Sequence, residues 1–387
     1  MKEVFNTPGK VIVTCYKRLS PYLQEEICAL GFEIKRTFST GIETTASVNE
    51  CIRLNLNLRT AGQVLYEIGA FRARNAQELY NALVKISWED LIPVDGYFSV
   101  TSFVNNETIT TPLYANVKVK DAIVDRIKDK IGKRPNSGAD LSKAVIHLHW
   151  VEDRAEIFLD TSGETLSKHG YRKHPGKAPM LEALATSTIM ATQWDRKSPF
   201  VNPMCGSGTL AIEAALIAQN RTPGLQRMNY SFMHFNGYDE SVFFQERRLL
   251  KEKTNKSNIP TIIASDISEQ AVEIARLNAK AAGVEHLIQF AVCDFAKTSI
   301  PETPGVIMFN PEYGERLGTH TKLEATYKRI GDFMKQRCKG YRGYVFTGNP
   351  DLAKKIGLKA SRRIEFFNGK LDCRLLQYEL YEGTKEK

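Results

Sequence analysis

The stretch that most constrains the fold is PFVNPMCGSGTL, at residues 199–210. A short apolar strand enters a loop with two glycines, Gly206 and Gly208, and the loop opens directly into a helix predicted over residues 209–219. Glycine allows a sharp turn with positive φ and lets a ligand approach the backbone closely. The free N–H groups at the start of the helix attract polar or anionic groups. The stretch therefore predicts a ligand site, although its Gly-x-Gly spacing fits a dinucleotide loop, an adenosylmethionine loop or an ordinary turn.

Strands and helices alternate through the rest of the second half of the chain. Beyond the glycine loop we expect strands over residues 261–265, 288–292, 306–309 and 344–347, with helices between most of them. Two last strands meet at Asn368-Gly369, a dipeptide that strongly favours a hairpin. This pattern is typical of an α/β fold with a mostly parallel sheet and an antiparallel last strand.

The first half of the chain is organised differently. Residues 10–68 follow a β-α-β-β-α-β order, which indicates a small ferredoxin-like α+β unit. Strands and helices repeat in a similar spirit up to about residue 160, with a long helix expected over residues 112–131. A chain of 387 residues exceeds one ordinary core, which favours two or three domains. We predict domains over residues 1–70, 71–164 and 165–387.

The charge balance favours a polyanionic partner. There are 53 Lys and Arg against 44 Asp and Glu, which gives a net charge of +9. Seven cations lie on the helix at residues 112–131 or just after it: Lys118, Lys120, Arg126, Lys128, Lys130, Lys133 and Arg134. They form either a solvated helix face with i,i+4 pairs or an RNA-binding surface.

Cysteine and histidine spacing indicates no metal site. The seven cysteines are scattered and contain no C-x-x-C pair, so they indicate neither a disulfide framework nor a zinc site. His147 and His149 share one face of a strand, but no acidic or sulfur ligand is placed to complete a site. The N-terminus has no apolar targeting segment, and no run of 18 apolar residues occurs. We expect a soluble cytoplasmic protein without a metal.

Polar residues follow four successive strands of the second half. The first strand ends at Asn202-Pro203, the second at Asp266, the third near Asp294 and the fourth at Asn310. Ligands of open α/β sheets lie beyond the carboxyl ends of the strands, so these residues should meet at one edge. There, an acid after the second strand can hold both hydroxyls of a ribose, and a carboxylate one strand further can accept from an adenine amine. Taken singly, each aspartate is equally well explained as a helix cap or turn residue.

The motif Asn310-Pro311-Glu312-Tyr313 carries a more specific chemistry. An exocyclic base amine is a poor nucleophile because its lone pair is delocalised into the ring. Two acceptors, the Asn310 side-chain oxygen and the Pro311 carbonyl, can hold its hydrogens and aim the nitrogen at an electrophilic methyl group. Tyr313 can stack on a base that has swung out of its helix. The ordinary alternative is a proline turn that ends a strand.

These motifs resemble those of a known family. Residues 202–209, the two strand-end aspartates and residues 310–317 are similar to Rossmann-like, adenosylmethionine-dependent RNA methyltransferases that act on the exocyclic amine of guanine. Residues 160–172 and 178–182 resemble the join between a THUMP RNA-binding domain and that catalytic domain. The likeness covers nearly the whole chain and is nearest to bacterial enzymes that make N2-methylguanine in large-subunit ribosomal RNA.

The resemblance implies a Rossmann-like class I methyltransferase domain after an α+β ferredoxin-like and THUMP region, S-adenosyl-L-methionine as cofactor, and RNA as partner. The implied cofactor contacts are Asn202, Pro203, Met204, Cys205, Gly206, Ser207, Gly208, Asp266, Ile267, Asp294, Phe295 and Asn310. The target base is addressed by Asn310, Pro311, Glu312 and Tyr313. The chain departs from the family at Glu312, where a second proline is usual, and at His169, where arginine is frequent.

Four alternatives stay open beside ribosomal RNA methylation. A nicotinamide dehydrogenase would need an acidic residue about twenty positions after the glycines, and it leaves residues 310–313 unexplained. A DNA adenine methyltransferase shares the Asn-Pro-x-Tyr logic but does not explain the RNA-module-like first half. Transfer RNA is a second RNA substrate class, and an RNA-binding ribosome-assembly factor with a weakened methyltransferase domain would be compatible with Glu312.

Overall fold

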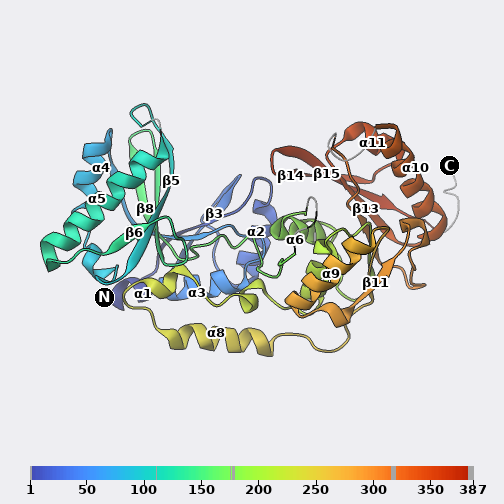
Figure 1. The fold of residues 1–387 in the computed structure, drawn as a ribbon, viewed down its shortest axis with the longest axis horizontal. Coiled ribbons are helices and arrows are strands. Elements are labelled where there is room, and N and C mark those ends of the chain that lie inside the picture. The colour runs from blue at the N-terminus through green and yellow to red at the C-terminus, as the bar shows by residue number, and fades with distance from the viewer. Residues whose placement is uncertain (1, 110, 175, 177–178, 315–319, 382–387) are drawn as a thin grey trace. The chain divides into compact units, whose positions relative to one another are not determined.

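The computed structural model describes residues 2–109, 111–174, 176, 179–314 and 320–381 (Figure 1). The chain forms two compact units. Unit 1 contains Met1–Tyr16, Leu23–Leu166 and Arg227–Leu249, and unit 2 contains Lys17–Tyr22, Ser167–Gln226 and Leu250–Lys387. The three domain boundaries predicted from the sequence stay a proposal beside this division.

Unit 1 is built on one eight-stranded sheet with strand order β2-β3-β1-β4-β8-β7-β5-β6. Its strands are β1 (Gly9–Thr14), β2 (Arg36–Phe38), β3 (Gly41–Ala46), β4 (Val64–Arg72), β5 (Tyr97–Asn105), β6 (Asn136–Gly138), β7 (Ala144–Val151) and β8 (Arg154–Asp160). Strand β4 pairs antiparallel with β1 on one side and with β8 on the other. The ferredoxin-like start and the region after it therefore share one continuous sheet.

The helices associated with this sheet confirm the predicted β-α-β-β-α-β start. They are α1 (Lys2–Asn6), α2 (Ser20–Ala29), α3 (Val48–Asn57), α4 (Ala76–Leu83) and α5 (Pro112–Ile131). Helix α3 begins at a capping box, in which the Glu50 carboxylate accepts from the Ser47 backbone N–H and the Ser47 hydroxyl accepts from the Glu50 N–H. Helix α5 has the predicted bounds, with proline at its first position and Gly132 in the left-handed conformation after its end.

An aromatic segment from the second half of the sequence completes unit 1. The Ser231 hydroxyl accepts from the backbone N–H of Val145 at 2.8 Å, and the Phe232 N–H donates to the Thr161 carbonyl at 3.1 Å. The rings of Tyr230 and Phe232 stack with centroids 5.1 Å apart. This segment interrupts the strand and helix alternation of the second half because its partners are strands of the first half.

The two histidines of β7 are packing and surface residues. His147 Nδ1 lies 2.9 Å from the Thr101 hydroxyl, and burial lowers the pKa of His147 to about 4. The His149 ring stacks on Phe103 at 5.3 Å. Among the described residues, no group of three or more His, Cys, Asp or Glu side chains is arranged to hold a metal ion.

Unit 2 is an α/β unit with strand order β11-β10-β9-β12-β13-β15-β14. Its strands are β9 (Phe200–Pro203), β10 (Ile262–Asp266), β11 (Ile288–Val292), β12 (Val306–Phe309), β13 (Arg342–Thr347), β14 (Arg362–Asn368) and β15 (Leu371–Glu379). The first five in spatial order are parallel, and β15 and β14 are antiparallel additions. This confirms the predicted mostly parallel sheet and the hairpin at Asn368-Gly369.

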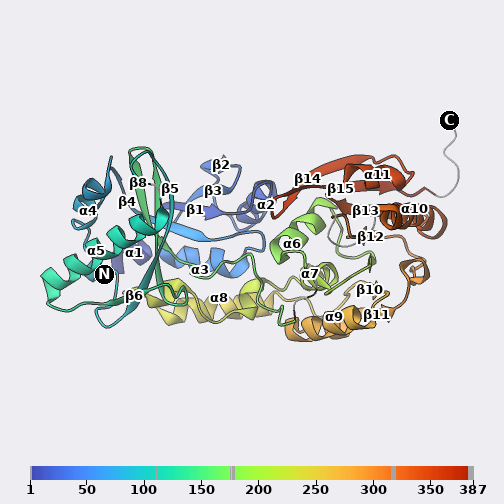
Figure 2. The same cartoon turned by 45° about the horizontal axis from the view of Figure 1, so that its top comes forward.

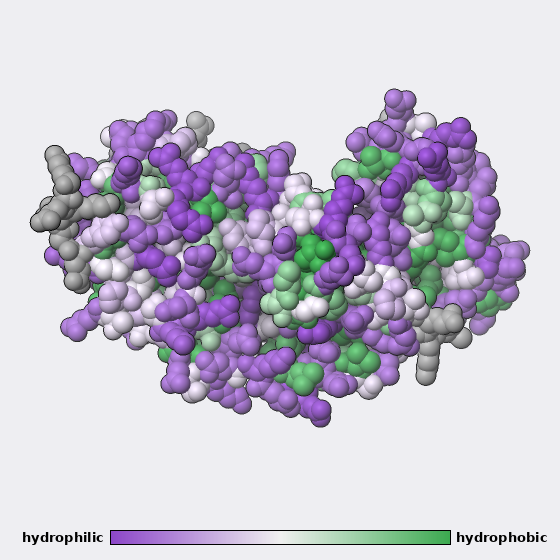
Figure 3. Space-filling model, turned by 180° about the vertical axis from the view of Figure 1, so that it is seen from behind, coloured by the Kyte–Doolittle hydropathy of each residue, from purple (hydrophilic) through white to green (hydrophobic). Residues whose placement is uncertain are grey.

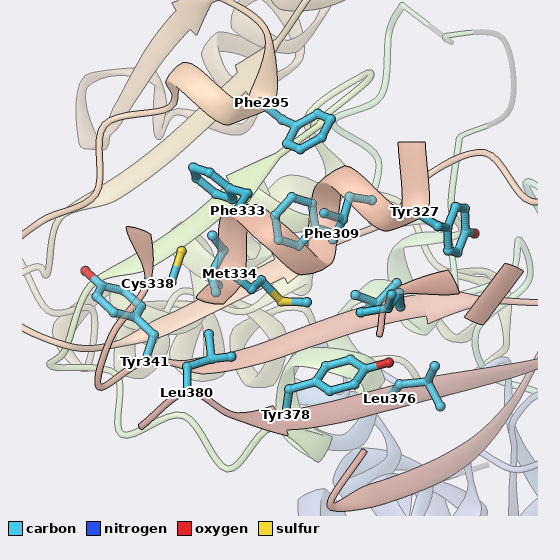
Figure 4. Packing of buried hydrophobic residues seen from close by; sticks show 14 of the residues in the cluster. Phe295, Phe309, Tyr327, Phe333, Met334, Cys338, Tyr341, Leu376, Tyr378 and Leu380 are labelled. Atoms are coloured by element: carbon cyan, nitrogen blue, oxygen red, sulfur yellow. The ribbon is translucent and has the colours of Figure 1, made fainter. Parts of the chain in front are cut away.

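Helices cover both faces of this sheet (Figure 2). They are α6 (Glu182–Ala191), α7 (Thr209–Ala218), α9 (Glu269–Ala282), α10 (His320–Arg337) and α11 (Pro350–Lys355), while α8 (Glu240–Glu252) spans the division between the units. Every residue of α7 is buried, as expected for a helix that is apolar on all sides. One core packs α10 and α11 on the sheet, with Phe295, Phe309 and Phe333 edge to face (Figure 4).

The surface is mainly hydrophilic, and the cysteines are reduced. Hydrophilic residues predominate on the face in Figure 3, where hydrophobic residues form small separate groups. No helix within the described ranges is long and apolar enough to cross a membrane. All seven cysteines lie in the described part of the chain and carry free thiols.

Candidate active site

The four strand ends singled out in the sequence meet at one edge of the unit 2 sheet. Strands β11, β10, β9 and β12 are neighbours in that order and run parallel. The chain leaves β9 towards β10 and β11 on one side and returns to β12 on the other, so β9 and β12 form the switch point. The Asn202 amide N–H donates to the Met308 carbonyl of β12 at 2.9 Å, which ties the two strands together where their connections diverge.

The glycine loop after β9 has an unusual backbone. Met204, Gly206 and Gly208 have φ values of 59°, 54° and 82°, all in the left-handed region. A methionine there stores backbone strain, a feature that clusters at functional sites. A Cβ on Gly208 would lie 2.8 Å from the Ala275 Cβ, so helix packing requires glycine there, whereas a Cβ on Gly206 would meet nothing within 4 Å. Gly206 therefore presents open backbone towards a ligand.

Asp266 at the end of β10 shapes this loop. Its Oδ2 accepts from the Gly206 N–H at 3.0 Å, and its Oδ1 accepts from the Ser268 N–H at 3.0 Å, just before α9. The carboxylate is thus fixed on both oxygens, and each keeps a further lone pair for a ligand. Ile267 beside it is 73% exposed. The sequence indicates a ligand role for Asp266 but not its bond to the glycine loop.

Asp294 follows β11 and pairs with a cation that no sequence pattern singles out. Its Oδ1 accepts from Arg329 Nη2 of α10 at 2.7 Å and from the Ala296 N–H at 2.9 Å. The Arg329 guanidinium holds the pKa of Asp294 below its ordinary value, against the opposing effect of burial. Arg329 also lies 4.8 Å above the Phe295 ring, which is buried in the core. The Phe295 side chain is therefore committed to packing.

Two buried amide oxygens at the switch point have no hydrogen-bond partner among the residues that the structure describes. They are Oδ1 of Asn202 and Oδ1 of Asn310, neither of which meets a hydrogen-bond donor in the part of the chain that the structure describes. Buried polar atoms are almost always paired, and an exception at a sheet edge needs an explanation. Both oxygens are acceptors, so they fit a group that brings N–H or O–H donors to this edge.

The rest of the 310–313 motif is held by its neighbours. Pro311 is buried, and the Glu312 side chain is exposed while its carbonyl accepts from the Tyr327 hydroxyl at 3.3 Å. The Tyr313 hydroxyl accepts from the Asn368 amide at 2.7 Å, and its ring packs edge to face on Phe346. The hairpin turn thus fixes a partly buried Tyr313. Residues 315–317, at the end of the family motif, lie outside the described residues.

Beneath the glycine loop lies a buried polar network. His169 Nδ1 is 2.7 Å from Oε1 of Glu213 in α7, both side chains are fully buried, and the Thr186 hydroxyl donates to Oε2 at 2.8 Å. The Arg172 guanidinium donates to the hydroxyl of Thr209, the first residue of α7, at 3.0 Å. No local sequence pattern in residues 169–172 reveals these partners on α6 and α7.

Burial makes the Cys205 thiol at this edge a poor nucleophile. It raises the pKa of the Cys205 thiol well above its ordinary value, and the nearby Asp266 carboxylate acts in the same direction. The thiol of the glycine loop therefore stays protonated near neutral pH, which does not suit a nucleophile.

Three family models together match nearly the whole chain. The RMKL-like methyltransferase domain matches residues 169–377, the THUMP domain residues 73–160, and the RlmL ferredoxin-like domain residues 10–65. The methyltransferase match begins in the buried network and ends in β15, so it contains all four strand ends.

Known proteins resemble the chain along its length. A ribosomal RNA large subunit methyltransferase K/L from Syntrophotalea carbinolica is 34% identical over 97% of this chain, which spans about half (54%) of that relative. The crystal structure of SMU.472 complexed with SAH has a TM-score of 0.88, with 26% identity over 98% of this chain and 99% of that one. A predicted N6-adenine-specific DNA methylase from Listeria monocytogenes has a TM-score of 0.86, with 30% identity over 97% of both chains.

The matched domains confirm the resemblance and the fold expected from the sequence, and S-adenosylmethionine is the cofactor of such methyltransferases. Because one model covers more than half of the residues and places the glycine loop, both aspartates and Asn310 inside a methyltransferase domain, the chain belongs to the RMKL-like methyltransferase family, with RlmL-type ferredoxin-like and THUMP domains before its catalytic domain.

Proposed function

We propose that the protein is an S-adenosylmethionine-dependent RNA methyltransferase that acts on the exocyclic N2 amine of guanine in large-subunit ribosomal RNA. The observation that carries the proposal is the buried, unpartnered Oδ1 of Asn310, which no donor of the described chain reaches, followed by Pro311 at the switch point of the sheet. An acceptor there is placed to hold a donor of the target base beside the glycine loop.

The cofactor-binding residues are assigned from the geometry of the edge. The loop at residues 202–208, with open backbone at Gly206 and a helix that has no side-chain cap, suits the polar methionine end. The carboxylate of Asp266 is assigned to the ribose and that of Asp294 to the adenine amine, and the exposed Ile267 offers apolar contact. When bound, the cofactor supplies an electrophilic methyl group carried on sulfur.

The protein groups orient the nucleophile. We assign the Asn310 oxygen and the Pro311 carbonyl as acceptors for the two hydrogens of the guanine amine. Two such bonds direct the nitrogen lone pair away from the ring and towards the methyl group, which is a positioning effect. Tyr313, fixed by Asn368, is assigned to stacking against the extruded base.

The RNA assignment rests on the first half of the chain and on its relatives. A THUMP domain precedes the catalytic domain, and a 34% identical relative is named for the large ribosomal subunit. Some cations of α5 and of the segment after it have partners: Arg126 pairs with Glu89 at 2.7 Å, and Lys120 donates to the Gly138 carbonyl. The exposed Lys128 and Arg134 form a second group, which makes no ion pair with any described carboxylate. The second group is available to bind phosphates.

Transfer of labelled methyl groups tests this proposal directly. The purified protein is incubated with labelled S-adenosylmethionine and protein-free ribosomal RNA, transfer RNA or DNA, and with Asn310→Ala protein as control. We expect label in large-subunit ribosomal RNA alone. Label in transfer RNA or in DNA adenine instead would reject the substrate assignment, the second outcome agreeing with the name of the Listeria neighbour.

Asp266→Ala is expected to weaken S-adenosylmethionine binding by about 1–3 kcal/mol, because it leaves polar groups of the ligand and the Gly206 N–H unpaired. Isothermal titration calorimetry measures the change. Asp195→Ala is a matched control, since that carboxylate also accepts from two backbone N–H groups, of Lys197 and Ser198, in a turn before β9. Equal affinities of the two variants would contradict the assignment of Asp266.

Glu312 is expected to act through its backbone. Its side chain is exposed and its carbonyl takes the Tyr327 hydrogen bond, so Glu312→Gln should change the single-turnover methylation rate by no more than about twofold. A tenfold loss with unchanged cofactor affinity would show that the carboxylate reads the guanine ring N–H. A gain of activity in Glu312→Pro would mark Glu312 as a weakening departure from the family.

A further inference from the structure

A pocket of 410 Å³ lies in unit 2, away from the glycine loop. It is lined by residues at or just beyond the C-terminal ends of three helices, α7, α8 and α9. Helices α7 and α9 begin at the carboxyl edge of the sheet and run back along it, so their ends lie at the opposite edge. Ten residues of α7 alone account for a separation of about 15 Å from the active site.

The pocket is rich in positive charge. Arg221, Lys251 and Lys256 line it together with His286, and no described carboxylate forms an ion pair with any of the three cations. The Arg221 guanidinium is partly buried, and its hydrogen bond is to the Gly283 carbonyl at 3.5 Å. Burial lowers the pKa of Arg221, as expected for a charge that has left water without gaining an anion.

Helix ends explain part of this arrangement. The C-terminus of a helix carries partial negative charge and attracts cations. Arg221 contacts Gly283, which follows α9, and Lys251 lies in the last turn of α8. Lys256 lies beyond α8, so it neither contacts the end of α9 nor belongs to the last turn of a helix. The charge at helix ends also does not explain the uncharged residues that line the pocket.

That wall contains an unpaired acceptor. Gln219 lines the pocket and is 8% exposed, and its side-chain oxygen is buried without a hydrogen-bond partner in the described chain. Leu225 adds apolar surface. Cations, one buried acceptor and an apolar side chain match the three parts of a nucleotide: phosphate, an N–H or O–H donor, and a ring.

We propose that this pocket binds a nucleotide of the RNA substrate at a distance from the target base. Its phosphate lies against Arg221, Lys251 and Lys256, and a donor of its base or ribose bonds to Gln219. The pocket would hold RNA on the catalytic unit itself, independently of the first half of the chain. The choice of RNA as the source rests on the proposed function, whereas the nucleotide chemistry rests on the pocket alone.

The test removes the two exposed cations, whose side chains form no hydrogen bond or ion pair within the described chain. The double variant Lys251→Gln/Lys256→Gln and the wild type bind protein-free large-subunit ribosomal RNA over a range of salt concentrations. We expect affinity to fall several-fold, and the slope of log K against log salt to become shallower by about one to two, since each phosphate that is no longer neutralised removes about one from the slope. The S-adenosylmethionine affinity of the variant should equal that of the wild type.

Matched variants separate a site from a general loss of charge. Arg337→Gln/Lys339→Gln removes the same charge from exposed positions at the end of α10 and should leave the salt slope unchanged. Gln219→Leu should weaken RNA binding without changing the slope, because it removes no charge. Equal slopes for the wild type and the lysine double variant, whether or not its melting temperature falls, would overturn the proposal.

Adenosine monophosphate distinguishes the source of the nucleotide. The proposal is wrong if adenosine monophosphate binds the wild type and the lysine double variant loses only this nucleotide binding. Unchanged RNA affinity of that variant would then show that the pocket takes a free nucleotide. The two proposals can also fail separately. If the wild type methylates no RNA, the proposed activity is rejected. If the lysine double variant nevertheless loses RNA affinity, the pocket is still supported as an RNA-binding site.

Discussion

Asn310→Ala is expected to lower the single-turnover rate of RNA methylation by about 10²–10³-fold, the loss typical when one group that stabilises a transition state is removed. The Asn310 oxygen is buried at the switch point and has no donor among the described residues, so it is available to hold the target amine. Alanine leaves that amine with one acceptor fewer and its lone pair less well aimed. Single-turnover assays with excess enzyme measure the chemical step.

Two controls accompany Asn310→Ala. Cofactor affinity, measured by calorimetry, separates loss of chemistry from loss of binding, because Asn310 is also assigned to the cofactor edge. Asn55→Ala, at a buried amide of α3 in unit 1 whose oxygen also has no partner in the described chain, reports the cost of losing a buried amide outside the candidate site. A rate within threefold of the wild type in Asn310→Ala would contradict the role of this residue.

His169→Ala is expected to lower the free energy of unfolding by about 3–5 kcal/mol, the cost typical of breaking a buried pair by removing one partner. His169 Nδ1 lies 2.7 Å from Glu213 Oε1, and both side chains are fully buried. Glu213 lies on α7, the helix that follows the glycine loop. Truncation leaves the carboxylate with its Thr186 bond but without His169. Urea unfolding of the full chain measures the change.

The double variant His169→Leu/Glu213→Leu tests the physical reason. Replacing a buried pair by apolar groups of similar size often costs little, so the double variant should recover most of the stability that His169→Ala removes. A loss below about 1 kcal/mol in the single variant, or additive losses in the double variant, would show that the pair is not coupled. The family often has arginine in place of His169, so His169→Arg is a further informative variant.

The strand ends of unit 2 are predictable because parallel strands repeat a local pattern. Apolar runs end in Asn202, Asp266, Asp294 and Asn310, and the rule that carboxyl ends converge places them together. The hairpin follows from Asn368-Gly369. Very short elements are not predictable: α1 and β6 have five and three residues, too few to show a period. The sequence also does not mark the start of α6 at Glu182, because Leu181 before it provides no side-chain cap.

Long-range partners leave no mark in the sequence. Nothing near residue 231 indicates that Ser231 bonds to Val145, 86 residues earlier, so the sequence does not reveal that the aromatic segment packs in unit 1. The same holds for Arg329 beside Asp294 and for Asp266 beside Gly206, since each contact joins segments that are far apart in the sequence. The positive φ of Met204 has no sequence signal, because glycine is the residue that favours that conformation.

Mass spectrometry of nucleosides distinguishes guanine methylation from adenine methylation when large-subunit ribosomal RNA is compared from cells with the gene, without it, and with the gene encoding Asn310→Ala. We predict that the N2-methylguanosine content is higher in the first case than in the other two. An unchanged N2-methylguanosine content in all three, or loss of a methylated adenosine instead, would contradict the account.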